Sequence, residues 1–481
     1  MTAARIHVHR APMPRLISVY LYFLCFVLAG YVLLGRFFAY LGFPPLYIGE
    51  ITLVLGIAAA LMAGNLTGAI FNLPGLALAL LMLWTAFRTI PYWNIYKFDA
   101  LRDAVIVFYG LFAYVIASLI LQRPATLALL IERYKRFIPC IIFLSPVLPM
   151  AGYLSGVPMV WTYGSREIGG PKITELSCHV PAVIAFSLIG FVRLRSLVLI
   201  FVLLIGLFLA SQERQAMLTF TIGCFMASVF SPNRHALRNF FVVVGVLVVI
   251  LGIGSALNLR LAGQGEGRTF DARQLMINAT NVFSNSGSSR GDETREWRLN
   301  WWSDIIHYTL HGRYFWEGKG FGVNLADADG YQTFDDQSDV APLRSPHNAH
   351  MTILGRGGVP ALLMWIFALG SWLVAVVRQL IEARRVNDDW WAGVFAFLLT
   401  YWTIILISGS FDVALEGPVL GIWFWTIHGI GMAALILHRH RVFTLQSPRA
   451  MSESHGVPRA PHLRRLTATI QNLAGAGRGG A

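Results

Sequence analysis

One histidine stands where a polar stretch of the chain meets an apolar one. His347 follows Ser345-Pro346, precedes Asn348 and lies just before a long apolar segment. Because proline biases the preceding residue towards an extended conformation, this stretch is expected to place His347 at the water–membrane boundary. A neutral imidazole there can accept a proton from a hydroxyl group near neutral pH, and Asn348 can orient the ring or bind the hydroxyl-bearing molecule. The competing interpretation is a histidine that only caps a helix.

Arginines occupy positions that would suit an anionic ligand. Arg214 follows Glu213 in a short polar stretch between two apolar segments. Arg298 lies in a long polar region, and Arg344 stands three residues before His347. An arginine at a membrane surface is unfavourable unless it is paired, and phosphate is a natural partner for its planar fork of donors. The alternative for Arg214 is an ordinary loop arginine paired with Glu213.

The elements that must position these residues are transmembrane helices. Of the 481 residues, 56% are hydrophobic and only 13% are charged, whereas a soluble domain has about 25% charged residues. The apolar residues form blocks long enough to cross a bilayer, which predicts an all-α integral membrane protein with about twelve transmembrane helices. The predicted cores are 16–34, 46–63, 70–87, 104–121, 137–154, 176–192, 196–210, 215–230, 240–257, 358–377, 390–408 and 417–437.

The net charge of +13 is distributed as a topology signal. Cytoplasmic loops of membrane proteins carry an excess of Lys and Arg. Here the N-terminus and every even-numbered connection except the short second one are basic. Both ends are therefore expected in the cytoplasm, and the long connection 258–346 outside it. No compact basic domain or base-stacking motif indicates nucleic-acid binding, and the four cysteines have neither disulfide-framework nor metal-site spacing.

This topology divides the chain into regions of different character. An N-terminal transmembrane bundle of about nine spans occupies 1–257, and a C-terminal bundle of about three spans occupies 347–441. Between them lies the large extracytoplasmic loop 258–346, with an amphipathic helix expected near 294–310 and an acidic stretch at 327–339. The residues 442–481 are expected to form a disordered basic tail in the cytoplasm, in contact with anionic membrane lipids.

The order of these residues resembles the signature of the O-antigen ligase family. That signature is a His-Asn pair followed, after nine residues, by Gly-x-x-Gly. In this chain His347-Asn348 is followed after nine residues by Gly358-Val359-Pro360-Ala361, so alanine replaces the last glycine. This small-for-small departure leaves His347 untouched.

Two further segments are similar to that family. Where its members have a Ser-Arg pair, this chain has Ser211-Gln212-Glu213-Arg214, with two residues inserted. The spacing of Arg298 and Trp302 resembles the family's Arg-x-x-x-Trp helix, and Gly318-Lys319-Gly320-Phe321-Gly322 resembles its glycine-rich turn. The similarity covers about residues 211–361, the central part of the chain. Polymerases of surface polysaccharides and bacterial protein O-glycosyltransferases share the same signature.

The resemblance implies a GT-C-like, metal-independent, inverting glycosyltransferase of the bacterial inner membrane that needs no cofactor. It would move a glycan from undecaprenyl diphosphate to a hydroxyl of an acceptor glycan or of lipid A-core on the periplasmic face, in lipopolysaccharide or exopolysaccharide biosynthesis. It also implies roles for individual residues. The implied roles are catalysis for His347 and Asn348, diphosphate binding for Arg214, Arg298 and Arg344, and structural support for Gly320, Gly322, Gly358 and Trp302.

Two alternatives remain open at the level of sequence. The first is a surface-polysaccharide polymerase of the same family, whose acceptor is another lipid-linked glycan. The second, from another class, is a flippase or transporter of lipid-linked oligosaccharides. Transporters tend to show paired halves or interrupted helices around a site at the membrane midplane. We find no internal repeat in this sequence, and the long polar loop favours chemistry at the membrane surface.

Overall fold

The computed structural model describes residues 15–155, 160–163, 166–233, 235–256, 260–262, 270–271, 289–332 and 343–441. The basic tail 442–481 and much of the connection 258–346 therefore lie outside the described residues, and the predictions for them stay predictions. The described elements are mostly helices, with short antiparallel β-hairpins between some of them.

The first half of the chain forms helices α1 to α10. Their bounds, with those of the first hairpin, are α1 Arg15–Leu34, α2 Arg36–Ala39, β1 Gly42–Phe43, β2 Leu46–Tyr47, α3 Ile48–Ala63, α4 Leu66–Ile70, α5 Leu73–Thr89, the 3-10 helix η1 Ile90–Tyr92, α6 Trp93–Tyr96, α7 Phe98–Phe108, α8 Leu111–Gln122, α9 Ala125–Phe143 and α10 Val147–Ser155.

The second half contributes the remaining helices and hairpins. They are β3 Val160–Tyr163, β4 Arg166–Gly169, α11 Ile173–Ile189, α12 Ser196–Gln212, α13 Arg214–Phe230, α14 Ala236–Ala256, β5 Arg260–Ala262, β6 Phe270–Asp271, α16 Ser289–Leu310, α17 Leu325–Asp329, α18 Ala349–Arg385, α19 Asp389–Gly409 and α20 Pro418–Arg439.

The helices form a bundle whose outer surface suits lipid. Within the described residues, five helices are long and apolar enough to cross a membrane, or six if the bent pair α7 and α8 is counted as one span. Shorter apolar helices such as Ile173–Ile189 pack among them. Large apolar side chains also point outward, for example Leu83 at 69% and Leu197 at 81% exposure. The chain is therefore a multi-pass membrane protein, while the number of about twelve spans remains a prediction.

Two of the expected spans have a different form. The span at 104–121 is the pair α7 and α8, which meet at 44°. The expected span 137–154 is not one helix: α9 ends at Phe143, and α10 begins only at Val147. Pro146 lies in this break and has no N–H to continue the helical hydrogen bonds.

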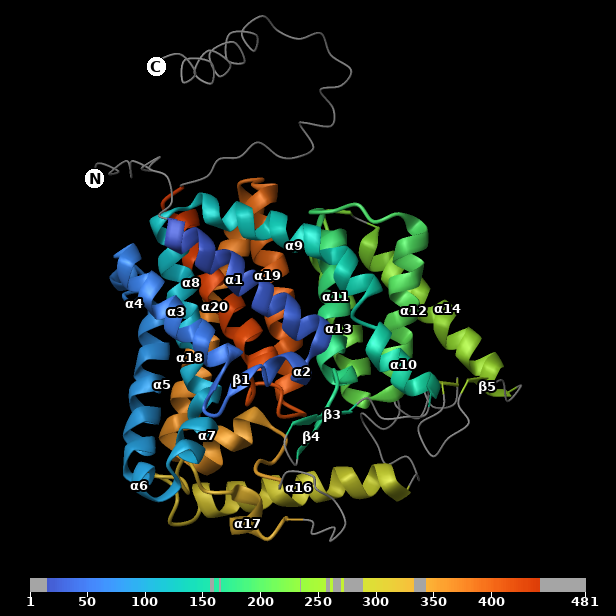
Figure 1. Cartoon of the computed structure of the whole chain (residues 1–481). Coiled ribbons are helices and arrows are strands. Elements are labelled where there is room, and N and C mark those ends of the chain that lie inside the picture. The colour runs from blue at the N-terminus through green and yellow to red at the C-terminus, as the bar shows by residue number, and fades with distance from the viewer. Residues whose placement is uncertain are drawn as a thin grey trace, which may run out of the picture.

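Helix α9 runs across the upper end of the bundle, crosswise to α19 and α20 (Figure 1). It buries Leu127 and Ile138 and exposes Glu132, Lys135 and Arg136. A helix with one apolar and one charged face that lies crosswise to the spans suits the membrane surface better than its interior.

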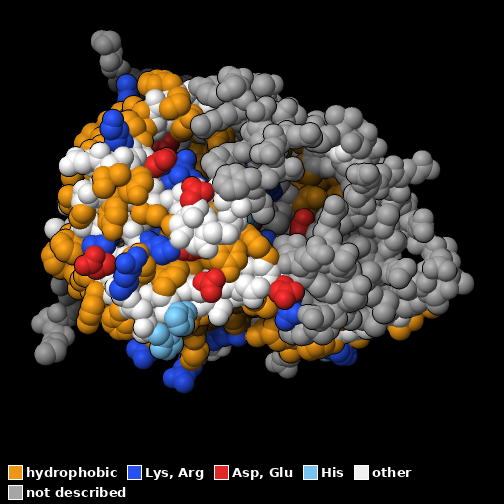
Figure 2. Space-filling view, turned by 90° about the horizontal axis from the view of Figure 1, so that it is seen from below, with side chains coloured by type: hydrophobic (Ala, Val, Ile, Leu, Met, Phe, Trp, Pro, Cys, Tyr) orange, Lys and Arg blue, Asp and Glu red, His pale blue; other side chains and the backbone are white. Residues whose placement is uncertain are grey.

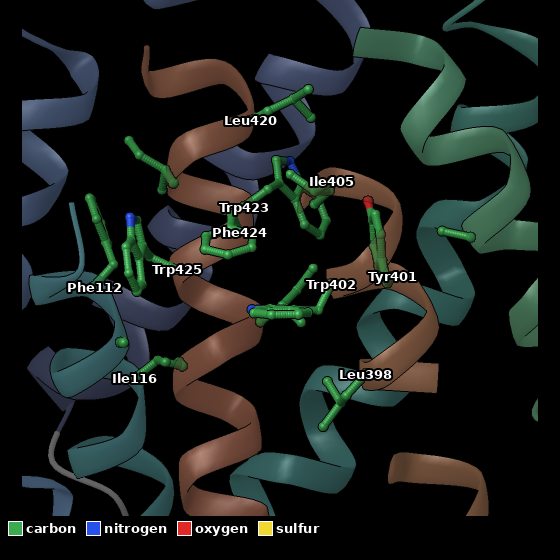
Figure 3. Packing of buried hydrophobic residues seen from close by; sticks show 14 of the residues in the cluster. Phe112, Ile116, Leu398, Tyr401, Trp402, Ile405, Leu420, Trp423, Phe424 and Trp425 are labelled. Carbon is green, nitrogen blue, oxygen red and sulfur yellow. The ribbon is translucent and has the colours of Figure 1, made fainter. Parts of the chain in front are cut away.

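The core of the bundle lies where α8, α19 and α20 meet. Figure 3 shows Phe112 of α8 beside Trp425 on one side of α20. On the other side of α20, Trp402 and Tyr401 of α19 lie beside Phe424 and Trp423. Trp402 stacks on Trp372 of α18 with ring centroids 4.7 Å apart. Aromatic pairs of this kind add about 0.5–1.5 kcal/mol to the burial of their surface. The C-terminal helices are thereby fixed relative to one another, and so are the segments that join them.

The two ends of the bundle differ in composition. At the upper end, Arg384 of α18 donates to the carbonyl of Phe230 at the end of α13 over 2.9 Å, which joins two of the basic connections. At the lower end, α16 lies across the bundle, and its Tyr308 donates to Asp329 of α17 over 3.3 Å (Figure 1). Figure 2 shows this end from below, with basic and acidic side chains interspersed among apolar ones. The amphipathic helix expected at 294–310 is present as α16, and which end faces the cytoplasm stays a prediction.

Candidate active site

The segment that carries His347 is held from both sides. Trp302 of α16 donates its indole N–H to the carbonyl of Pro346 over 2.8 Å. The side chain of Asn348 caps α18 by accepting from the backbone N–H groups of His350 and Met351 at 2.9 and 3.2 Å. His347 itself has a positive φ of 53°, a conformation uncommon for residues other than glycine. The fixed neighbours on each side keep it there.

This geometry gives Asn348 a structural role. Its side-chain oxygen accepts from the first backbone N–H groups of α18 and so caps the helix, while its part in catalysis stays a prediction. Asp412, in the connection between α19 and α20, lies against the ring of His347. Its Oδ1 lies 3.2 Å from Nδ1 of His347, with 11% of the Asp412 side chain and 25% of the His347 side chain exposed.

Asp412 is held as a carboxylate by its surroundings. Burial opposes ionisation, but the hydrogen bond from His347, the charge of Lys172 and the N–H of Val413 together hold the pKa of Asp412 well below its usual range. The Lys172 ammonium lies 3.8 Å from Oδ2, and the Thr174 hydroxyl donates to the same oxygen over 3.2 Å. Asp412 therefore remains negative at neutral pH. A carboxylate on Nδ1 favours the tautomer in which Nε2 carries the free lone pair.

His347 and Asp412 stand on the wall of a cavity of about 700 Å³. Residues from α10, α11, α13 and α16 complete the wall, together with the segment 170–172 before α11. Basic side chains gather on it: Lys172, Arg214, Arg295 and Arg298. The acidic groups on the same wall are Glu213 and Asp412. The lining thus has an excess of positive charge, which suits an anionic ligand.

Arg298 is half-buried on this wall. Its Nη1 donates to the carbonyl of Phe411 over 3.0 Å, beside Asp412. Burial lowers the pKa of Arg298, and the carboxylates of Asp412 and Glu213 partly offset that effect. The usual pKa of arginine is so high that the group stays protonated. A half-buried guanidinium of this kind interacts more strongly with an anion than a fully solvated one, because less water competes for it.

The backbone adds to the positive potential of the cavity. Helices α11 and α13 begin at its wall, since Ile173 and Thr174 of the first and Arg214 and Gln215 of the second line it. Helix α18 begins two residues after His347. The N-terminus of a helix carries roughly half a positive charge, so these ends favour phosphate oxygens in the same space.

Arg344, expected to bind the anion, lies outside this cavity. Its guanidinium pairs with Asp103 of α7 at 2.9 Å and with Asp99 at 3.5 Å, and it donates to the carbonyl of Gly322. Asp103 also pairs with Arg356 of α18 at 2.7 Å. This buried network ties the loop before His347 to the N-terminal part of the bundle. The structure therefore gives Arg344 a partner within the protein.

The glycines of the signature explain how α18 can be broken beside the site. Gly358 interrupts the helix with φ 76° and ψ −175°, two residues before Pro360. The carbonyls of Gly355 and Arg356, which lose their helical partners at the break, accept from the N–H groups of Lys319 and Gly320 at 2.7 and 2.9 Å. The glycine-rich turn thus docks onto the broken helix.

Gly320 and Gly322 allow this docking through their positive φ angles of 94° and 105°. A Cβ at Gly320 would lie 2.2 Å from the ring of Tyr92, and one at Gly322 would lie 2.7 Å from Cβ of Tyr96. Both positions therefore require glycine, for conformation and for space. These glycines position the first turns of α18 and with them His347.

Sequence reasoning placed His347, Arg214 and Arg298 in the site, and the structure brings all of them to one cavity. The sequence alone did not point to Asp412 or Lys172. Both lie in connections that the positive-inside pattern assigns to the same face as His347. Asp412 could have been found from the sequence as a charged residue in a short connection on the same face as His347.

Residues 199–366 match the model of the O-antigen ligase family. This part of the chain belongs to the O-antigen ligase family. The resemblance read from the motifs is thereby confirmed, and the chain is a membrane protein of polysaccharide biosynthesis. A search of the curated proteins gave no match.

The matched segment covers α13, α16 and the first part of α18, and so includes Arg214, Arg298 and His347. Lys172 and Asp412 lie before and after it. The matched segment therefore does not complete the cavity alone, because the connection between α19 and α20 supplies the carboxylate that contacts its histidine.

Proposed function

We propose that this chain transfers a glycan from undecaprenyl diphosphate to an acceptor hydroxyl on the extracytoplasmic face of the bacterial inner membrane. The observation that carries the proposal is the His347–Asp412 pair on the wall of a cavity lined by Lys172, Arg214 and Arg298. Proton abstraction and diphosphate binding are the two tasks of such a transfer, and groups suited to each stand on one wall.

His347 acts as the general base in this proposal. Asp412 keeps the proton on Nδ1, so Nε2 can take the proton of the acceptor hydroxyl as its oxygen attacks the anomeric carbon. The new bond joins that carbon to the acceptor oxygen. The bond to the diphosphate oxygen breaks on the opposite face of the sugar, so the configuration of the anomeric carbon inverts.

The arginines and Lys172 stabilise the leaving group. The electron pair of the broken bond remains on the diphosphate, whose negative charge grows as it departs. Arg214 and Arg298 offer planar forks of donors to its oxygens, and the beginnings of α11 and α13 add fixed dipoles. Because these cations are part of the protein, the proposed reaction needs no metal ion, and we expect transfer to continue in the presence of a chelator.

The decisive experiment replaces His347 by alanine in a host strain that lacks its own copy of the gene. We expect normal amounts of protein in the membrane, loss of transfer and accumulation of glycan on the lipid carrier. His307→Ala is the matched control, because His307 is an exposed histidine of α16 that does not line the cavity. Unchanged transfer by the His347→Ala protein would contradict the proposal and favour the transporter alternative.

The same strain distinguishes the two kinds of transferase. A ligase accepts finished chains, so its loss leaves long chains on the carrier. A polymerase joins repeat units, so its loss leaves single units there. We propose the ligase reaction, in which lipid A-core or another glycan supplies the hydroxyl. Single units on the carrier lipid of the His347→Ala strain would assign the chain to the polymerases instead.

A further inference from the structure

A second cavity lies beneath α9, at the opposite end of the bundle from His347. Its volume is about 120 Å³, and apolar side chains of α1, α8, α19 and α20 line most of it, among them Leu24, Ile116, Leu398 and Ile427. An engineered apolar cavity of about 150 Å³ stays free of water and takes up benzene. A space of this size and lining therefore suits part of a hydrocarbon chain.

The same cavity has one guanidinium on its wall. Arg133 of α9 is half-buried, lies 3.7 Å from the centre of the Tyr22 ring and donates towards Sγ of Cys25 over 3.6 Å. Neither neighbour is an anion. No carboxylate of the residues that the structure describes comes within 4.0 Å of its nitrogens.

A neighbouring arginine on the same helix behaves differently. Arg136 is exposed and pairs with Glu132 over 3.4 Å, as surface arginines commonly do. Arg133 instead lies over the ring of Tyr22 at the edge of the apolar cavity, without a carboxylate partner among the described residues. A half-buried cation in a membrane is unfavourable unless an anion accompanies it, and a phosphate group fits the planar fork of arginine.

We propose that Arg133 and the cavity beneath α9 form a binding site for an anionic phospholipid. The lipid phosphate contacts the guanidinium, and the end of one acyl chain enters the cavity. The position of the site supports a lipid over a free phosphate ion, since the remaining lining is mostly apolar and α9 lies crosswise at the end of the bundle, where lipid headgroups gather (Figure 1). Basic groups at a membrane surface attract anionic lipids in this way.

This inference does not depend on the proposed transfer reaction. The site lies at the end where α9 crosses the bundle, and none of its lining residues lines the cavity of His347. The anionic lipid would hold α9 against α1 and α20, and so stabilise the end of the bundle opposite to the active site.

The test uses the full chain, purified in detergent and stripped of lipid. Thermal unfolding is followed while phosphatidylglycerol, phosphatidylcholine or inorganic phosphate is added, and bound lipid is counted by native mass spectrometry. We expect phosphatidylglycerol to bind about fivefold more tightly than phosphatidylcholine, as one favourable charge contact at a membrane surface implies. Inorganic phosphate alone should have no effect. Equal binding of the two lipids, or equal stabilisation by free phosphate, would overturn the proposal.

Variants then separate the headgroup contact from the cavity. Arg133→Gln should remove the preference for phosphatidylglycerol, while Arg136→Gln, the matched control on the same helix, should keep it. Ala29→Phe fills the cavity from α1 and should weaken the binding of both lipids, although Arg133 is intact; Ile430→Trp fills it from α20 if the first variant does not fold. A preference that survives Arg133→Gln contradicts the site, and unchanged affinity in the filled variants contradicts the place of the acyl chain.

Discussion

The Nδ1 atom of His347 lies 3.2 Å from Oδ1 of Asp412, although sixty-five positions of the chain separate the two residues. The first precedes α18 and the second follows α19. The contact therefore joins the connection before α18 to the connection after α19, and both lie at the same end of the bundle. Because α18 and α19 are fixed by the packing of Trp372 against Trp402, the distance between imidazole and carboxylate is set by the core of the membrane domain.

We expect Asp412→Asn to lower the rate of glycan transfer severely while the protein still folds. The amide has the shape of the carboxylate but lacks its charge, so it neither fixes the tautomer of His347 nor stabilises the imidazolium formed during transfer. A general base contributes on the order of 10²–10⁴-fold to a rate, and we expect at least the lower part of that range to be lost. The measurement is kcat with purified protein and a lipid-linked donor.

The control for this prediction is Asp304→Asn. Asp304 is an exposed carboxylate of α16 that contacts Tyr331 and does not line the cavity. It should leave kcat unchanged. If Asp412→Asn transfers glycan at the wild-type rate, the carboxylate does not act through His347.

Replacing Arg214 by lysine tests the recognition of the diphosphate. Lysine keeps the positive charge but offers no planar fork, so it holds the departing diphosphate less well. Loss of one donor to a developing anion commonly costs on the order of 10²-fold in rate, and we expect a fall approaching that size for Arg214→Lys and for Arg298→Lys. Arg313→Lys changes an exposed arginine that does not line the cavity and should have no effect. Near wild-type transfer by Arg214→Lys would remove this arginine from the site.

The charge pattern also predicts which end of the bundle faces outward. In a protein without its native cysteines, Arg313→Cys lies in the connection after α16, and Lys135→Cys lies on the exposed face of α9. A thiol reagent that cannot cross the inner membrane should label only Arg313→Cys in cells with a permeable outer envelope. Labelling of Lys135→Cys alone would invert the topology and place the His347 cavity in the cytoplasm.

The sequence predicted the helices well where the residues of a single segment determine whether a helix forms. Apolar runs such as 390–408 and 417–437 correspond to α19 and α20 within a few residues, because length and hydrophobicity decide whether a helix can span. The apolar run 137–154 was predicted as one span, but Pro146 interrupts it and α9, with its charged face, begins before it. Hydrophobicity averaged over a window cannot distinguish a span from two shorter helices joined at a proline.

The site was only partly predictable because its electrostatics depend on distant partners. The role given to Arg344 followed from its nearness to His347 in the sequence. Its carboxylate partner Asp103, however, lies 241 positions away. The Thr174 hydroxyl bonds Asp412 across 238 positions. Local motifs identify side chains that can do chemistry, but only the packed bundle decides which of them meet an internal counterion.

The network around Asp103 makes a prediction for stability. Asp103→Asn removes the carboxylate that pairs over 2.7 Å with Arg356, which is 1% exposed. Breaking a buried ion pair by removing one partner costs about 3–5 kcal/mol, so we expect a marked fall in the temperature of unfolding in detergent. Asp99→Asn is the matched control, because Asp99 is 47% exposed and its pairs with Arg102 and Arg344 are longer; it should cost at most about 1 kcal/mol. Equal effects of the two variants would mean that the buried network does not stabilise the loop before His347.

Two glycines of the same helix should respond in opposite ways to alanine. Gly358 has φ 76° and ψ −175°, a region that is almost restricted to glycine, and occupying it costs another residue about 1–3 kcal/mol. A Cβ there would also lie 2.6 Å from the carbonyl oxygen of Phe315, so the turn 315–320 must shift away from α18.

Gly370 lies further along α18, and a Cβ there meets nothing within 4 Å. Alanine in that helical position should stabilise the protein by roughly 0.5–1 kcal/mol. We therefore expect Gly358→Ala to lower both the unfolding temperature and the transfer rate, since the shifted turn no longer holds the first part of α18, which begins just after His347. Gly370→Ala should raise the unfolding temperature slightly and leave activity unchanged. If Gly358→Ala is as stable and as active as the wild type, the break in α18 does not position the histidine.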